Sequence, residues 1–102
     1  MYAEFYWPYL QQWILRLIDA GVVPVVFCEG TYTKRLKYLQ DVPKGKVIYY
    51  FENVDMKEAK RVLGGTACIM GGFPLNLVSQ GKPEAIRDKV KEYMDIMAPG
   101  GG

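Results

Sequence analysis

Three short segments of the chain are apolar at almost every position, and this feature constrains the fold most. They are residues 22–28, 46–51 and 66–70. The first is rich in β-branched side chains, which strands favour. A strand that is apolar on both faces is typical of a parallel sheet, where helices cover the two sides. We therefore predict three strands that are buried on both faces, with Pro24 near the start of the first because it cannot donate to a strand ladder.

Amphipathic helical patterns separate and flank these three segments. Residues 8–20 carry apolar side chains at helical spacing, and Gly21 follows as a stop. A turn is expected at residues 29–31, and the helix that follows carries Tyr32, Leu36 and Leu39 on one stripe. A third helix begins at Asp55 in a variant of the capping box, and a fourth begins at Pro83 and carries Tyr93 among the apolar side chains at helical spacing. The predicted order is α-β-α-β-α-β-α in one partial domain over residues 1–102. Strands that alternate with helices form right-handed βαβ units and a parallel sheet.

Composition excludes several classes of site and partner. The chain contains no histidine, so it cannot supply imidazole as a base, an acid or a metal ligand. Its net charge of +2 gives no reason to expect nucleic acid as a partner. No apolar run approaches the roughly 20 residues that span a bilayer, so we expect no membrane association. Two cysteines, far apart in sequence, are expected to be reduced thiols in a cytoplasmic protein.

Groups that can carry chemistry follow the predicted strands. In parallel α/β sheets, functional residues gather at the carboxyl ends of the strands. Here those ends supply Cys28, Glu29, Glu52, Asn53, Gly71 and Gly72. Carboxylates handle protons or bind cations, thiolates bind soft metals, and glycines let a ligand approach the backbone. We therefore predict Glu29 and Glu52 as catalytic residues, Asn53, Gly71 and Gly72 as substrate-binding residues, and Cys28 as a metal contact.

Each of these residues also has a purely structural interpretation. Glu29 and Glu52 are consistent with solvated loop positions, and Cys28 with a small buried apolar side chain. Gly71 and Gly72 are consistent with a bend at the end of a strand. Cys68 is expected to be structural. A flavodoxin-like domain is disfavoured because the first strand is followed by an acidic residue rather than by a loop that cradles phosphate.

Several segments resemble, in order and spacing, the C-terminal half of the uroporphyrinogen decarboxylase superfamily, which includes cobalamin-dependent methyltransferases. Residues 5–10 resemble an aromatic-rich entry to a barrel helix, and residues 19–24 a lead into a strand. Residues 51–60 resemble the next strand end with its capped helix. Residues 70–74 lie where the family has a glycine- and proline-containing turn, and residues 98–102 resemble the approach to a following strand.

The resemblance implies part of a (β/α)8 barrel, because three strands are less than half of one. It implies that the decarboxylase's catalytic aspartate, arginines and histidine lie outside this segment, so none is carried over. In the methyltransferase branch, zinc is held by a His-x-Cys pair. Cys28 matches the cysteine of that pair, but Val26 stands at the histidine position. Zinc or a corrinoid is therefore expected only in a longer parent protein.

Charge favours one branch of the family. Uroporphyrinogen is a polycarboxylate and calls for arginine or lysine in its pocket, whereas the strand ends here offer Glu29 and Glu52. We expect a parent of the corrinoid-linked methyltransferase type or an uncharacterised relative, with this segment inactive by itself. The alternatives are a true uroporphyrinogen decarboxylase, and a non-catalytic α/β module. In either case we expect self-association through the open sheet edges, as a homodimer or a larger assembly.

Overall fold

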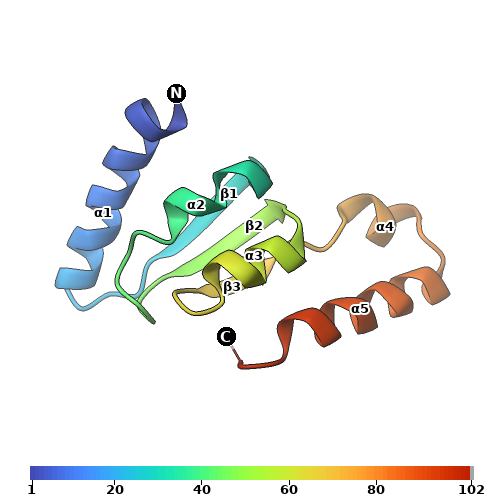
Figure 1. The fold of residues 1–102 in the computed structure, drawn as a ribbon. Helices are drawn as coiled ribbons and strands as arrows, with labels where there is room; N and C mark the ends of the chain where they lie inside the picture. The colour runs from blue at the N-terminus through green and yellow to red at the C-terminus, as the bar shows by residue number, and fades with distance from the viewer. Residues whose placement is uncertain (102) are drawn as a thin grey trace.

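The structure is a computed structural model that describes residues 1–101 (Figure 1). Its helices are α1 (Trp7–Asp19), α2 (Leu36–Leu39), α3 (Met56–Leu63), α4 (Leu75–Gln80) and α5 (Pro83–Met97). Its strands are β1 (Val25–Thr31), β2 (Ile48–Asn53) and β3 (Cys68–Gly71). A π-helical turn, Tyr2–Tyr6, precedes α1, and a 3-10 turn, Thr33–Arg35, precedes α2. The predicted alternation of helices and strands is confirmed, and α4 is an addition to it.

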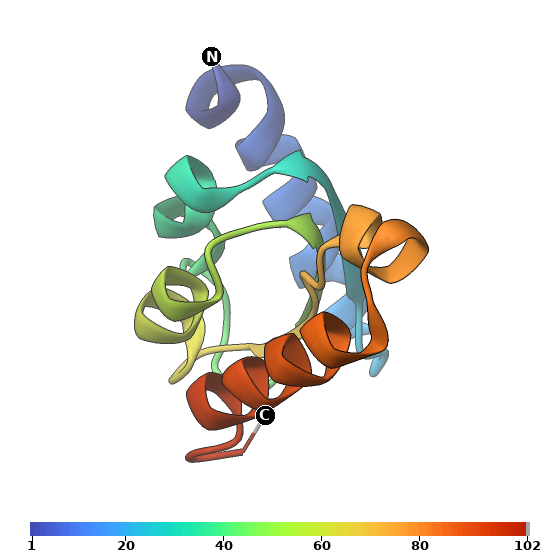
Figure 2. The same cartoon turned by 90° about the vertical axis from the view of Figure 1, so that its right-hand side faces the viewer.

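The three strands form one parallel sheet in the order β1-β2-β3. Val25, Ile48 and Cys68 are in register at the amino ends of the strands, and Cys28, Phe51 and Gly71 near the carboxyl ends. Figure 2 shows α2 and α3 on the same side of the strands. This is the parallel βαβ arrangement of part of a TIM barrel. Because the order is sequential, β1 and β3 are both edge strands.

Each strand lies two or three residues later in the sequence than predicted at one or both ends. β1 starts at Val25 because Pro24 has no N–H to donate, although its carbonyl accepts a hydrogen bond from the Ile48 N–H at 3.0 Å. β1 also continues through Glu29 and Gly30, where a turn was predicted, to Thr31. Glu52 and Asn53 therefore belong to the last residues of β2 rather than to a loop.

The strands were predicted to be buried on both faces inside a larger α/β assembly, and within residues 1–101 only one face is covered. Tyr49 and Phe51 on β2 are buried beneath α2 and α3, but Val25, Phe27 and Met70 are largely exposed on the opposite face. Side chains alternate between the two faces of a strand, so one set packs against α2 and α3, while the other set remains largely exposed in residues 1–101. In a barrel, the second face is the interior.

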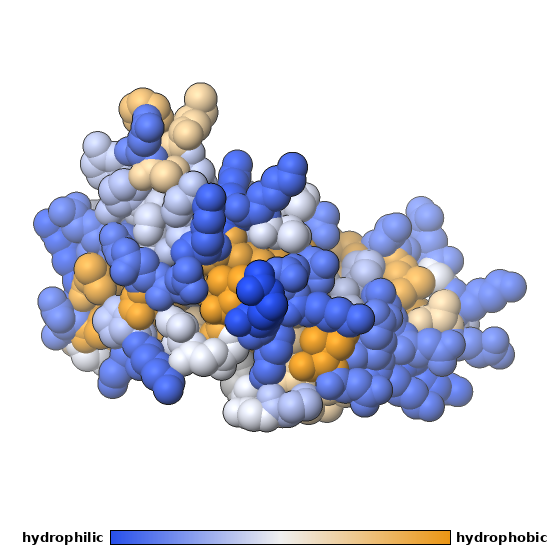
Figure 3. All heavy atoms as spheres, in the orientation of Figure 1, coloured by the Kyte–Doolittle hydropathy of each residue, from blue (hydrophilic) through white to orange (hydrophobic). Residues whose placement is uncertain are grey.

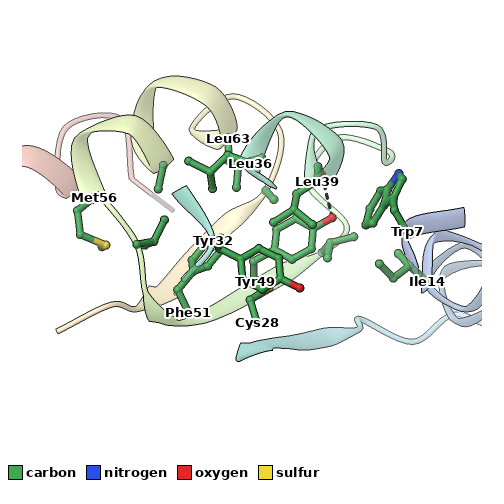
Figure 4. Packing of buried hydrophobic residues seen from close by; sticks show 14 residues of the cluster. Trp7, Ile14, Cys28, Tyr32, Leu36, Leu39, Tyr49, Phe51, Met56 and Leu63 are labelled. Carbon is green, nitrogen blue, oxygen red and sulfur yellow. Dashed lines mark hydrogen bonds between the residues drawn. The ribbon is translucent and has the colours of Figure 1, made fainter. Parts of the chain in front are cut away.

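The core lies between the sheet and the helices (Figure 4). Leu36 and Leu39 of α2 and Leu63 of α3 are almost fully buried in it. The Tyr49 hydroxyl crosses this layer and donates to the Leu39 carbonyl at 2.8 Å, which satisfies its polar group within an apolar environment. The strands are therefore held to the helix layer by packing and by one buried hydrogen bond.

One helix start has the capping side chain that the sequence predicts, and another has no capping side chain. Asp55 caps α3 as predicted, since its carboxylate accepts from the N–H groups of Lys57 and Glu58 at 3.0 and 3.3 Å. By contrast, α4 starts after Pro74 with no side-chain cap. Its sequence contains asparagine, valine and serine, which are poor helix formers, so no sequence signal predicts it.

None of the helices within residues 1–101 combines the length and the apolar character that crossing a bilayer requires. Exposed apolar side chains nevertheless interrupt the hydrophilic surface on the face drawn in Figure 3.

Candidate functional site

The carboxyl ends of the three strands meet around an open hollow of about 440 Å³. We call it the strand-end hollow. Its lining includes Thr31 from β1, Glu52 and Asn53 from β2, Gly72 and Asn76 from the segment after β3, and Tyr93 from α5. The structure therefore brings together three of the predicted site residues, Glu52, Asn53 and Gly72. They come from neighbouring strand ends, as the parallel topology requires.

Glu52 is fixed by the backbone of the adjacent strand. The Gly30 N–H donates to Glu52 Oε2 at 2.6 Å, which is a short, charge-assisted hydrogen bond. The other carboxylate oxygen accepts no hydrogen bond from the described residues. Glu52 is thus an oriented carboxylate with one oxygen available to a bound molecule.

Further hydrogen bonds tie the ends of β1 and β2 together. The Asn53 amide nitrogen donates to the Thr31 hydroxyl at 3.2 Å, and the Tyr32 N–H donates to the Asn53 carbonyl at 3.0 Å. Side chains held in this way lose less freedom when a ligand binds. The rim of the hollow beside Glu52 is consequently a preorganised polar surface.

Glu29 lies in a different hollow. The register of β1 against β2 is irregular between Cys28 and Thr31, and Gly30 has a φ of +81° within this irregularity. Such bulges redirect side chains at the ends of strands. Glu29 lines a second hollow of about 520 Å³, together with Met1, Arg35 and the aromatic rings of Tyr2, Phe5, Tyr6, Phe27 and Tyr32. We call it the aromatic hollow. The structure does not place Glu29 in the same hollow as Glu52.

The two predicted substrate-binding glycines have structural reasons for being glycine. Both have positive φ, +81° for Gly71 and +78° for Gly72. A Cβ on Gly71 would lie 2.5 Å from the Phe51 carbonyl oxygen, and one on Gly72 would lie 2.5 Å from Met56 Sδ. The neighbouring strand and α3 therefore occupy the space in which a ligand was expected to approach. Gly72 still contributes its carbonyl, which accepts from the Tyr93 hydroxyl at 3.2 Å.

Cys28 points away from both hollows. It is fully buried in the helix-facing layer with Phe51, its register partner. Burial raises the pKa of the Cys28 thiol to about 12, so it stays protonated at neutral pH. No three His, Cys, Asp or Glu side chains within residues 1–101 lie close enough together to hold a metal ion. These residues do not fit a zinc site, and the position of Cys28 matches its interpretation as a small buried apolar side chain.

Sequence reasoning missed Thr31, Asn76 and Tyr93. The sequence predicts a turn at Thr31, and Asn76 belongs to α4, which the sequence does not predict. The sequence places Tyr93 in the apolar stripe of the last helix, and Tyr93 does pack edge-on against Phe73 with ring centroids 5.7 Å apart. Its hydroxyl, however, reaches the strand-end hollow. A tyrosine in an apolar stripe carries a polar group that needs a partner, and this is the signal that was available.

Comparison with known proteins gives one clear result. Residues 1–102 match a family model described as Uroporphyrinogen decarboxylase (URO-D). Neither the curated proteins nor the solved structures gave a match. The matched range includes all three strands and both hollows.

Proposed function

The chain belongs to the uroporphyrinogen decarboxylase family, and from this premise we propose that it supplies part of the substrate site of a barrel enzyme of the methyltransferase type. The substrate is a methyl group carried on a corrinoid, or a similarly small group. The observation that carries this proposal is the charge of the strand-end hollow. Among the described residues, its lining includes the carboxylate of Glu52 and no arginine or lysine. A polycarboxylate would be repelled there.

The residues of the hollow suit the handling of a proton. When a thiol or hydroxyl acceptor takes up a methyl group, its sulfur or oxygen forms a bond to the methyl carbon. The bond between that carbon and the methyl donor breaks, the donor keeps the electron pair of that bond, and the acceptor loses its S–H or O–H hydrogen as a proton. The proton that is released can pass to the free oxygen of Glu52, which the Gly30 N–H holds in position. Asn53 and Thr31 supply neutral polar groups that can orient the acceptor.

The experiment compares the two branches of the family directly. The protein, purified at its native length, is mixed with methylcobalamin and a thiol in one assay, and with uroporphyrinogen in the other. Corrinoid absorbance reports loss of the methyl group, and chromatography reports decarboxylated porphyrinogens. We expect turnover in the first assay only. Turnover in the second assay alone, or in neither assay, overturns the proposal. Decarboxylation of uroporphyrinogen is the second candidate function, because it is the activity that the name of the matched family describes.

The exposed face of the sheet supports self-association with a second copy of the chain. Val25, Tyr50 and Met70 are exposed apolar side chains on one face of the sheet, beside the aromatic hollow, and burial of such a surface is favourable. We therefore propose a homodimer in which two such faces cover each other.

We expect Val25→Asp to weaken dimerisation at least about tenfold, because each dimer would bury two unpaired charges. Sedimentation velocity over a range of concentrations measures this effect. Val78→Asp on α4 is the matched control, since Val25 and Val78 are 58% and 57% exposed. A purely monomeric wild type, or an equal effect of the two variants, contradicts the proposed interface.

A further inference from the structure

The aromatic hollow combines three features that the proposed proton handling at Glu52 does not use. It has walls of aromatic rings, one carboxylate and one guanidinium. Phe5, Tyr6 and Phe27 are 70%, 52% and 55% exposed, which is unusual for such large apolar side chains gathered in one place. These side chains come from the π-helical turn and from β1, so the fold itself brings them together.

Arg35 is held in place without an ionic partner. Its guanidinium carbon lies 4.8 Å from the centroid of the Tyr2 ring and 5.6 Å from that of Tyr32. These two rings are themselves packed edge-on, with centroids 5.8 Å apart, and their hydroxyls are 3.2 Å apart. Within residues 1–101, the Arg35 side chain forms no ion pair and no hydrogen bond. A guanidinium that is oriented by stacking and keeps its N–H donors free is suited to bind a carboxylate.

Glu29 supplies the opposite charge in the same hollow. It does not pair with Arg35, since no nitrogen–oxygen distance between the two is within 4.0 Å in the described part of the chain. Burial raises the pKa of Tyr2 and of Tyr32, so both phenols stay neutral at physiological pH. The charged side chains that line the hollow are thus one anion and one cation, set apart among aromatic rings.

We propose that the aromatic hollow binds a small zwitterion that carries both an alkylated ammonium group and a carboxylate. The carboxylate pairs with Arg35, while the ammonium group lies against the aromatic rings close to Glu29. Rings of this kind attract alkylated cations through their π faces, and the alkyl groups gain from contact with the apolar walls. An unalkylated ammonium would lose more hydration and gain less contact. A role of this zwitterion as a substrate depends on the proposed methyl-transfer function. Its binding in the aromatic hollow does not depend on that function.

Three probes separate the contributions to binding. Glycine betaine carries both charges, choline carries only the cation, and 3,3-dimethylbutanoate replaces the trimethylammonium group with a neutral group of the same shape. Titration calorimetry with the full chain measures each affinity. We expect glycine betaine to bind at least about tenfold more tightly than either of the other two compounds, because each of those lacks one charge-assisted contact and a contact of this kind contributes about a factor of ten to the affinity.

Variants assign the two charges to their residues. Arg35→Gln should weaken glycine betaine about 10- to 100-fold and leave choline unchanged, whereas Glu29→Gln should weaken both compounds. Arg35→Lys keeps the contact with Tyr2 and should retain part of the affinity, which guards against local unfolding. Lys34→Gln and Glu84→Gln change exposed charges outside the hollow and serve as matched controls.

The outcomes distinguish this inference from the proposed function. Equal binding of glycine betaine and 3,3-dimethylbutanoate, or no saturable binding of any probe, overturns the zwitterion site. Neither result affects a methyl transfer measured with methylcobalamin. Conversely, tight binding of glycine betaine without any methyl transfer supports the site and counts only against the proposed function.

Discussion

Replacement of Gly71 by alanine is expected to lower the free energy of unfolding by about 3 kcal/mol. About 1–2 kcal/mol comes from the positive φ of +81°, which places a Cβ too close to the following carbonyl. A further 1–3 kcal/mol, approximately, comes from the contact of that Cβ with the Phe51 carbonyl oxygen at 2.5 Å, because backbone of the central strand has little freedom to move. Urea unfolding followed by circular dichroism measures the loss.

Gly45→Ala is the matched control for Gly71→Ala. Gly45 has a similar φ of +76°, but a Cβ there would meet nothing within 4 Å. We expect a loss of only about 1–2 kcal/mol for this variant, from backbone strain alone. The difference between the two variants therefore measures the close approach of β3 to β2. Equal losses would mean that the contact with Phe51 contributes nothing and that Gly71 is glycine for another reason.

The architecture was predictable from the sequence because its signals are local. The apolar segments that became β2 and β3, and the cap at Asp55, follow from periodicity and hydrogen-bonding chemistry within a few residues. The first and last residues of each strand were harder to predict from the sequence. They depend on which N–H groups meet a partner strand, and only the parallel register shows that β2 extends through Glu52 to Asn53.

The candidate site was predictable only in part, because strand parity decides which side chains share a face. Cys28 and Glu29 are adjacent in sequence, yet one is buried against the helices and the other lines the aromatic hollow. Gly30 is the one residue in the sequence that points to the irregular strand register between Cys28 and Thr31. Long-range contributions, such as the Tyr93 hydroxyl on the Gly72 carbonyl, depend on how α5 folds back toward the sheet. No local pattern encodes this placement.

The second large effect is expected at Glu52 and concerns activity rather than stability. Glu52→Gln keeps the size of the side chain, and its amide oxygen can still accept the hydrogen bond from the Gly30 N–H. The substitution removes the charge and most of the basicity of the free oxygen. In the protein at its native length, kcat for methyl transfer should fall about 10²- to 10⁴-fold, which is the contribution of a positioned acid or base.

The pattern of kinetic constants distinguishes proton transfer from substrate binding. A group that acts only in the transition state changes kcat while KM stays nearly constant, whereas a binding group changes KM. We therefore expect the loss for Glu52→Gln almost entirely in kcat, with an unchanged midpoint of thermal unfolding. Glu84→Gln, which neutralises an exposed carboxylate at the start of α5, should leave both constants unchanged. If Glu52→Gln retains kcat within about twofold while Glu84→Gln behaves as expected, the oriented carboxylate at the end of β2 is not the proton acceptor, since loss of a positioned base costs far more.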